Sequence, residues 1–344
     1  MITLRPKSRS KLFDLNLKPI GPFLAATIAS AAFTGMFVAT PALAASCCGG
    51  GSATTLILPK GARHLYDFSI DIESYDGFWN QDGEQVNDPA GSDLSQYRMN
   101  FGYAYRFADN WQFSAILPLV KNDNVYPGIS AQNTALGDTT LSVWYETFDQ
   151  ITCVWQVNTF ADLRPAIYIG SSILLPTGKS AYSDGVDNSF EVTGRGLYRW
   201  DANLIVEKTI YPVTLNAQGS YGAYLERPVN QEFDNAVEPY DKKLGDRRYL
   251  SASVAYTYFF EDVDALTVSA AIADLREGAG KINGQSDPLT EMKKSSVSLS
   301  TTYESEDKSW LLKGSWSHAI SKDDWGQSFP ITDIFTIGVS YVVR

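Results

Sequence analysis

The chain has 344 residues, with 28 Lys and Arg against 39 Asp and Glu, and a formal net charge of −11 at pH 7. Its first 44 residues carry five basic residues and one acidic residue, so the remainder is more negative by four, at −15. This balance argues against nucleic acid as a partner, because phosphate binding requires a basic face. Aromatic residues make up 13% of the chain, which argues against disorder. Beyond the N-terminus no stretch approaches the roughly 18 apolar residues of a membrane-spanning helix.

Residues 1–44 have the three-part pattern of a secretory signal peptide. A basic, polar start precedes an apolar run from Phe23 to Thr40, and a small-residue cleavage site follows at Ala42–Ala44. A membrane anchor is the alternative, but the run lies at the short end of spanning length. We therefore expect cleavage here and a mature, exported chain that begins near Ala45.

Residues 45–61 are predicted to form a flexible periplasmic segment that carries two adjacent cysteines, and that either stays in the periplasm or folds into the barrel mouth. Cys47 and Cys48 are followed by three glycines, whereas Cys153 lies far along the chain. Adjacent thiols can bind a soft metal or form a disulfide, although two sulfurs do not complete a tetrahedral zinc site. An exported protein tolerates disulfides. We expect Cys153 to pair with Cys47 or Cys48, and a metal or a partner protein at the adjacent pair is the alternative.

From residue 62 onward, apolar and polar residues alternate at every second position. Tyr66 and Phe68, for example, alternate with Asp67 and Ser69. This period predicts β-strands with one apolar and one polar face. The segments with this pattern are 62–75, 93–107, 111–120, 137–148, 166–176, 194–208, 213–226, 246–259, 265–276, 294–304, 309–320 and 333–343.

The links between these segments alternate in length. Long polar links follow the first, third, fifth, seventh, ninth and eleventh segments, and short ones follow the second, sixth, eighth and tenth. The link at 149–165, after the fourth segment, is the exception. Short periplasmic turns and long extracellular loops are typical of outer-membrane barrels, whose sheet must close because lipid leaves no partner for an unpaired backbone group. A soluble sandwich would not sort its loops in this way. The sequence therefore predicts an all-β protein, a single closed antiparallel transmembrane β-barrel of about 12 strands over residues 62–344, embedded in lipid of the bacterial outer membrane.

The polar face of the predicted barrel carries charged side chains that point into the lumen. They are Asp67, Asp71, Glu73, Arg98, Arg106, Arg199, Asp201, Glu207 and Lys313. Acids of the first strand can meet arginines of the second across the pair. These charges either form a lattice that fills a narrow barrel or make an electrostatic constriction that selects solutes. A wide pore is not expected, because barrel diameter grows with strand number.

Catalysis has few candidate residues. His318 has the lipid-facing parity, whereas Ser315 and Ser317 face the other way, so no nucleophile shares its face on that strand. No phosphate-binding or zinc motif is present. We therefore expect no enzyme activity and no cofactor.

Two short motifs carry a resemblance to a known family. One is Gly137-Asp138-Thr139-Thr140-Leu141-Ser142-Val143-Trp144-Tyr145, and the other is Ile173-Leu174-Leu175-Pro176-Thr177-Gly178-Lys179. With Ala108-Asp109-Asn110-Trp111 running into Leu117-Pro118, they resemble the outer-membrane transporter-like barrels labelled "MetA-pathway of phenol degradation". The resemblance implies a channel or transporter for a small hydrophobic or aromatic solute. The alternative is a structural barrel that docks a periplasmic redox or metal protein through residues 45–61. We expect the motif residues to have structural roles and not to bind a ligand.

Overall fold

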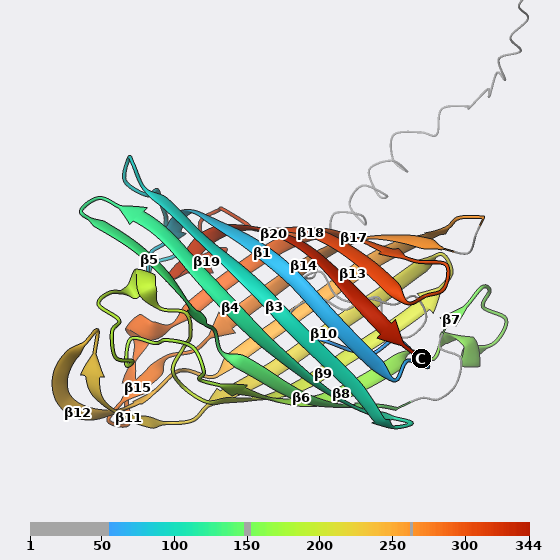
Figure 1. Ribbon diagram of the computed structural model, residues 1–344, viewed down its shortest axis with the longest axis horizontal. Helices are drawn as coiled ribbons and strands as arrows, with labels where there is room; N and C mark the ends of the chain where they lie inside the picture. Colours follow the sequence, from blue (N-terminus) through green and yellow to red (C-terminus); the bar gives the residue numbers. More distant parts are fainter. Residues whose placement is uncertain (1–54, 148–152, 262–263) are drawn as a thin grey trace, which may run out of the picture. The chain divides into compact units, whose positions relative to one another are not determined.

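The computed structural model describes residues 55–147, 153–261 and 264–344, and within them the long strands form one antiparallel barrel (Figure 1). The barrel strands are β1 (His64–Trp79), β3 (Asp93–Ala108), β4 (Trp111–Tyr126), β6 (Thr139–Glu146), β8 (Ala166–Leu175), β9 (Arg199–Ile210), β10 (Val213–Tyr224), β13 (Arg247–Phe259), β14 (Ala265–Glu277), β17 (Met292–Glu304), β18 (Trp310–Ala319) and β20 (Phe329–Val343). Each corresponds to one predicted segment.

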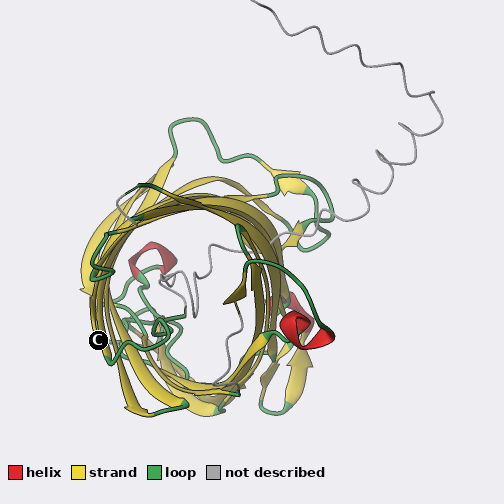
Figure 2. Cartoon of the chain, turned by 90° about the vertical axis from the view of Figure 1, so that its right-hand side faces the viewer, coloured by secondary structure: helices red, strands yellow, loops and turns green. Residues whose placement is uncertain are grey.

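The sheet closes on itself. β1 pairs with β3 on one side and with β20, the last strand, on the other. β9 pairs with both β8 and β10, which joins the two ends of the strand order. Figure 2, seen along the barrel, shows the resulting ring with loop segments inside it. The predicted closed twelve-stranded barrel is confirmed, and closure gives every strand of the wall two hydrogen-bonded neighbours.

Short turns gather at the end of the barrel where the C-terminus lies, and long loops gather at the other end (Figure 1). The long loops hold β2 (Gln85–Val86), β5 (Ile129–Leu136), β11 (Arg227–Glu232), β12 (Asn235–Lys243), β15 (Gly280–Ile282), β16 (Gln285–Asp287), β19 (Gly326–Gln327) and the 3₁₀ helices η2 (Ser189–Glu191) and η3 (Pro288–Thr290). The link after β6 carries β7 (Cys153–Val154) and η1 (Phe160–Leu163). By the rule for such barrels, the long-loop end is extracellular.

Several strands differ from their predicted bounds. β4 continues to Tyr126, where it pairs with β5, although its pattern ends at residue 120. Polar side chains lie on both faces there, so the alternation is lost while the backbone pairing goes on. In contrast, β9 begins only at Arg199, because residues 194–198 belong to the preceding loop.

The outside of the barrel is apolar. Exposed side chains at alternate strand positions include Tyr66, Ile70, Leu204, Val254 and Leu299. Aromatic rings meet near the short-turn end, where Trp111 lies 4.9 Å from Tyr145 and Trp310 lies 4.8 Å from Tyr341 between ring centroids. Such belts mark the membrane–water boundary. No helix in the described part of the chain is long and apolar enough to cross a membrane.

Candidate functional site in the barrel lumen

The structure places all nine predicted lumen charges at inward-facing strand positions. One group lies on β1, β18 and β20. Asp67 of β1 forms an ion pair with Lys313 of β18 and accepts a hydrogen bond from the Ser340 hydroxyl of β20 at 2.5 Å. The Asp67 side chain is almost fully buried. A buried carboxylate is tolerated here because a cation and a hydroxyl both satisfy it.

A second set of contacts joins the acids of β1 to an arginine of β3. The Arg98 guanidinium lies 3.7 Å from the Asp71 carboxylate and 3.5 Å from Glu73. Asp71 also accepts hydrogen bonds from Asn100 and Thr336, each at 2.8 Å. These contacts join acids of the first strand to an arginine of the second, as the pairing of the two strands predicts.

Arg106, in contrast, does not meet an acid of β1. Its guanidinium lies 3.5 Å from the Glu146 carboxylate of β6 and donates to the backbone carbonyl of Ala62 at 3.2 Å. The reason is its position near the end of β3, beyond the acids of β1. Glu146 is a lumen residue that sequence parity missed, although Trp144 on the same face marks its orientation.

A further charged group lies on β9, β10 and β14. Arg199 donates to Asp201 at 2.8 Å and to the Tyr224 hydroxyl at 3.2 Å. That hydroxyl donates to Glu277 at 3.3 Å, and Glu277 also lies 3.6 Å from Arg195. Glu277 was missed because it lies one residue past the predicted end of its segment.

Glu207, the remaining one of the nine predicted residues, lies further along β9, toward the short-turn end of the barrel. Its carboxylate accepts a hydrogen bond from the Asn216 side chain of β10 at 3.3 Å, and it is buried.

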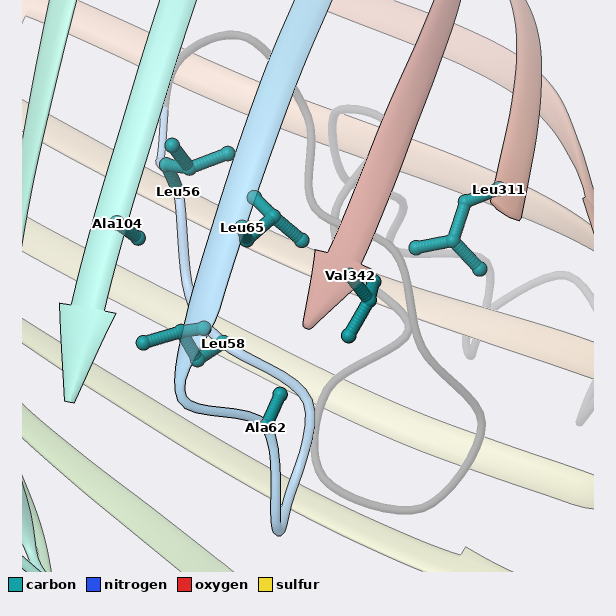
Figure 3. Close-up of a cluster of buried hydrophobic side chains, with 7 residues drawn as sticks. All are labelled: Leu56, Leu58, Ala62, Leu65, Ala104, Leu311 and Val342. Atoms are coloured by element: carbon teal, nitrogen blue, oxygen red, sulfur yellow. The ribbon is translucent and has the colours of Figure 1, made fainter. Parts of the chain in front are cut away.

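Residues 55–58 lie inside the barrel and cross its lumen near the short-turn end. Leu56 and Leu58, each 1% exposed, pack against inward-facing Leu65, Leu311 and Val342 of β1, β18 and β20 (Figure 3). These three strands lie side by side and form one wall.

The neighbouring side chain of the segment packs on a different part of the wall. Ile57 contacts Trp144 of β6, Tyr168 of β8 and Ile205 of β9, all buried. The Leu58 N–H donates to Gln112 Oε1 of β4 at 2.7 Å. At the other end of the segment, the Gln218 side chain of β10 donates to the Thr55 hydroxyl at 3.2 Å. Residues 55–58 thus contact inward-facing side chains of β4, β6, β8, β9 and β10 as well as of β1, β18 and β20.

The loop at 176–198 folds onto the inner face at the opposite end. Asn122 and Asn124, inward-facing on β4, donate to the carbonyl oxygens of Val192 at 2.9 Å and Phe190 at 3.2 Å. Asn133 of β5 donates to the Glu191 carbonyl at 2.6 Å. The described lumen is therefore narrowed from both ends by the chain itself.

The two motifs of the family resemblance meet in space at the base of this loop. The Asp138 carboxylate accepts the N–H of Gly178 at 3.1 Å and that of Arg195 at 2.6 Å. The Thr177 hydroxyl donates to the Gly137 carbonyl at 2.7 Å. A Cβ built on Gly178 would lie 2.8 Å from the Cα of Gly194, so both loop ends pass at backbone contact. These residues hold the loop in place.

Cys153 is buried on β7 and is disulfide-bonded. Cys47, Cys48 and the predicted signal peptide lie outside the described residues, so the pairing and the cleavage stay predictions. Among the residues that the structure describes, no group of three or more His, Cys, Asp or Glu side chains is placed to hold a metal ion.

His318 lies on the outer face. Its Nδ1 is 3.0 Å from the Asp333 carboxylate of β20, and its ring stacks on Trp316. Ser315 and Ser317 occupy the intervening inward positions of β18. The histidine therefore has an acidic partner but no serine of its own strand on its face.

Comparison with known proteins finds the same architecture in solved structures. No family model and no curated protein sequence matches the chain. The COG4313 outer membrane channel from Pseudomonas putida F1 has a TM-score of 0.61 at 11% identity, over 90% of this chain and 98% of that one. The Bordetella autotransporter BrkA β domain has a TM-score of 0.46 at 9% identity, over 81% and 99%. A TodX monoaromatic hydrocarbon channel has 0.40 at 14%, over 86% and 94%.

Sequence identities this low show a similar fold and nothing more. The closed wall, the apolar exterior and the similarity to the COG4313 channel together define a β-barrel protein of the bacterial outer membrane.

Proposed function

We propose that this protein is an outer-membrane channel for a small solute. The observation that carries the proposal is a polar, ion-paired lumen, in which residues 55–58 lie near the short-turn end. The COG4313 structure indicates that this architecture is compatible with a channel.

Within this class, we infer an aromatic solute. The resemblance of the motifs to the phenol-degradation family favours it. Support from the lumen is the buried group of Trp144 and Tyr168, beside which Ile57 packs. Once Ile57 leaves them, these aromatic rings can stack with a planar solute, while the neighbouring hydroxyls, amides and charges can bind a polar substituent. The solute that suits both features is a small aromatic compound with a hydroxyl or carboxylate group.

Reconstitution into planar bilayers and liposomes tests the channel. We expect stepwise conductance and faster liposome entry of 4-hydroxybenzoate than of a pentose of similar mass. If neither the wild type nor a Leu56→Ala/Leu58→Ala variant conducts, the channel is rejected. A closed barrel that instead co-purifies with a periplasmic protein through residues 45–61 would favour the anchoring alternative. Conductance without preference for the aromatic probe would reject the solute assignment only.

A further inference from the structure

The outer face of the barrel carries a row of basic side chains at its extracellular end. Arg248 of β13 is directly opposite Arg276 of β14, which is directly opposite Lys293 of β17. All three occupy outward-facing positions, because their neighbours Arg247, Glu277 and Lys294 alternate to the inner face. Like charges at directly opposed positions of a sheet are destabilising. The row is also exceptional in a chain whose net charge is strongly negative.

The same row lines a surface cleft of about 530 Å³ that the adjoining loops complete. Five basic residues line it against three acidic ones; the basic residues are Lys243, Arg248, Arg276, Lys281 and Lys293, and the acidic residues are Asp246, Glu277 and Glu291. Two of the acids are already engaged. Asp246 accepts a 2.5 Å hydrogen bond from Tyr221 and lies 3.9 Å from Lys243, while the buried Glu277 is paired from inside the barrel.

The donors in the cleft are only partly satisfied. Arg276 donates from its Nε to Asp274 at 2.7 Å, and among the described residues its terminal nitrogens make no ion pair. Lys293 donates to the backbone carbonyl of Asp324 at 2.5 Å. Within the part of the chain that the structure describes, Arg248 has no carboxylate within ion-pair distance. A cleft with surplus guanidinium donors suits a phosphate group, which the planar guanidinium binds through two parallel hydrogen bonds.

Toward the membrane from this row the surface becomes apolar, first on β13. Leu250, 64% exposed, occupies the next outward position after Arg248, whereas Asp274 and Ser295, which are hydrogen-bonded to each other, occupy it on β14 and β17. Val254, Val268 and Leu299 continue the apolar surface further along the three strands. An occupant of the cleft therefore meets cations at its head and hydrocarbon-facing side chains along its tail. Because the long-loop end faces outward, the molecules beside it belong to the outer leaflet.

We propose that this cleft binds the phosphorylated headgroup of an outer-leaflet lipid, whose acyl chains lie along the apolar strip that begins at Leu250. Phosphate lies across Arg248, Arg276 and Lys293 and neutralises the repulsion within the row. The site is on the outside of the wall and is independent of the lumen and of what passes through it.

Binding of lipopolysaccharide to the detergent-purified barrel, measured by native mass spectrometry and by thermal shift, tests the proposal. We expect Arg248→Gln/Arg276→Gln to bind at least tenfold more weakly. The matched control, Arg63→Gln/Lys308→Gln, removes two cations at the opposite end of the barrel and should bind as the wild type does. Lipopolysaccharide stripped of its phosphates should bind the wild type as weakly as intact lipopolysaccharide binds the double variant.

Three results would overturn the proposal. They are unchanged binding by the cleft variant, equal loss in the control, and equal binding of the dephosphorylated lipid. Inorganic phosphate is tested at the same concentration as the lipid. If it stabilises the wild type equally well, the cleft is a site for free phosphate and the lipid assignment is rejected. Loss of folding does not confound the test. The variant loses the exposed Arg276–Asp274 pair, which contributes little, and it relieves the repulsion within the row, so without lipid its thermal midpoint should be close to that of the wild type.

Discussion

Shortening a buried side chain of residues 55–58, the segment inside the lumen, should open the barrel. Leu56, Ile57 and Leu58 are almost fully buried, and burial of three such side chains contributes roughly 5–9 kcal/mol. The two hydrogen bonds to Gln112 and Gln218 add about 1–3 kcal/mol. Ordering the backbone of about five residues costs roughly 5–10 kcal/mol. The docked segment is therefore favoured by only a few kcal/mol.

Leu58→Ala removes a contact on which this small balance depends. Truncation of a buried leucine costs about 2–5 kcal/mol, and each ~1.4 kcal/mol changes an equilibrium tenfold. The released population should rise roughly 30-fold or more. Leu312→Ala is the matched control, since that leucine is exposed on the outer face of β18.

Single-channel recording gives the open probability, and hydrogen exchange reports the Leu58 amide, which is bonded to Gln112 when the segment is docked. We expect both the open probability and the exchange rate to rise in Leu58→Ala and to stay at wild-type values in Leu312→Ala. Fast amide exchange with unchanged conductance would show that residues 55–58 do not limit the channel. Slow exchange in the variant would refute the energetic argument itself.

Further predictions concern the lattice, the loop and the disulfide. Lys313→Met should destabilise the barrel by about 3–5 kcal/mol in urea unfolding, because it leaves buried Asp67 without its cation, and Asp67→Asn in the same chain should restore most of the loss. Asp138→Ala should raise hydrogen exchange of the two loop amides that the carboxylate accepts, while barrel unfolding changes little. Thiol labelling of the unreduced, denatured mature chain should modify one cysteine; three labelled cysteines would eliminate a disulfide at Cys153.

The strands of the barrel were predictable because lipid and water impose opposite demands on its two faces. Each strand had to place apolar side chains outward and polar ones inward, and a period of two residues carries that information. The same parity placed Asp67, Asp71 and Arg98 on the inner face. It could not say which charges would pair, since pairing depends on the position of each residue along neighbouring strands. Arg106 accordingly meets Glu146 and no acid of β1.

Residues 55–58 were not predictable as a lumen segment from alternation, because they do not alternate. Leu56-Ile57-Leu58 is a continuous apolar run beside Pro59, and all its faces are buried. Such a run indicates burial on every side, as in a fully enclosed strand. Read in that way, the apolar run favours the barrel mouth over the periplasm, which are the two placements that the order of the strands leaves open for this part of the segment.

The inward position of the loop at 176–198 was predictable only in part. Its contacts run from asparagine side chains of the wall to loop carbonyl groups, and a carbonyl group has no sequence signature. What the sequence does carry is the anchor, since Asp138 and Gly178 both belong to the family-like motifs and are hydrogen-bonded to each other. The motifs therefore encode how a loop is fastened inside a barrel. For the proposed channel, the loop-anchoring residues of the motifs therefore carry no solute preference, and we assign selectivity to inward-facing side chains such as Trp144, Tyr168 and Arg199.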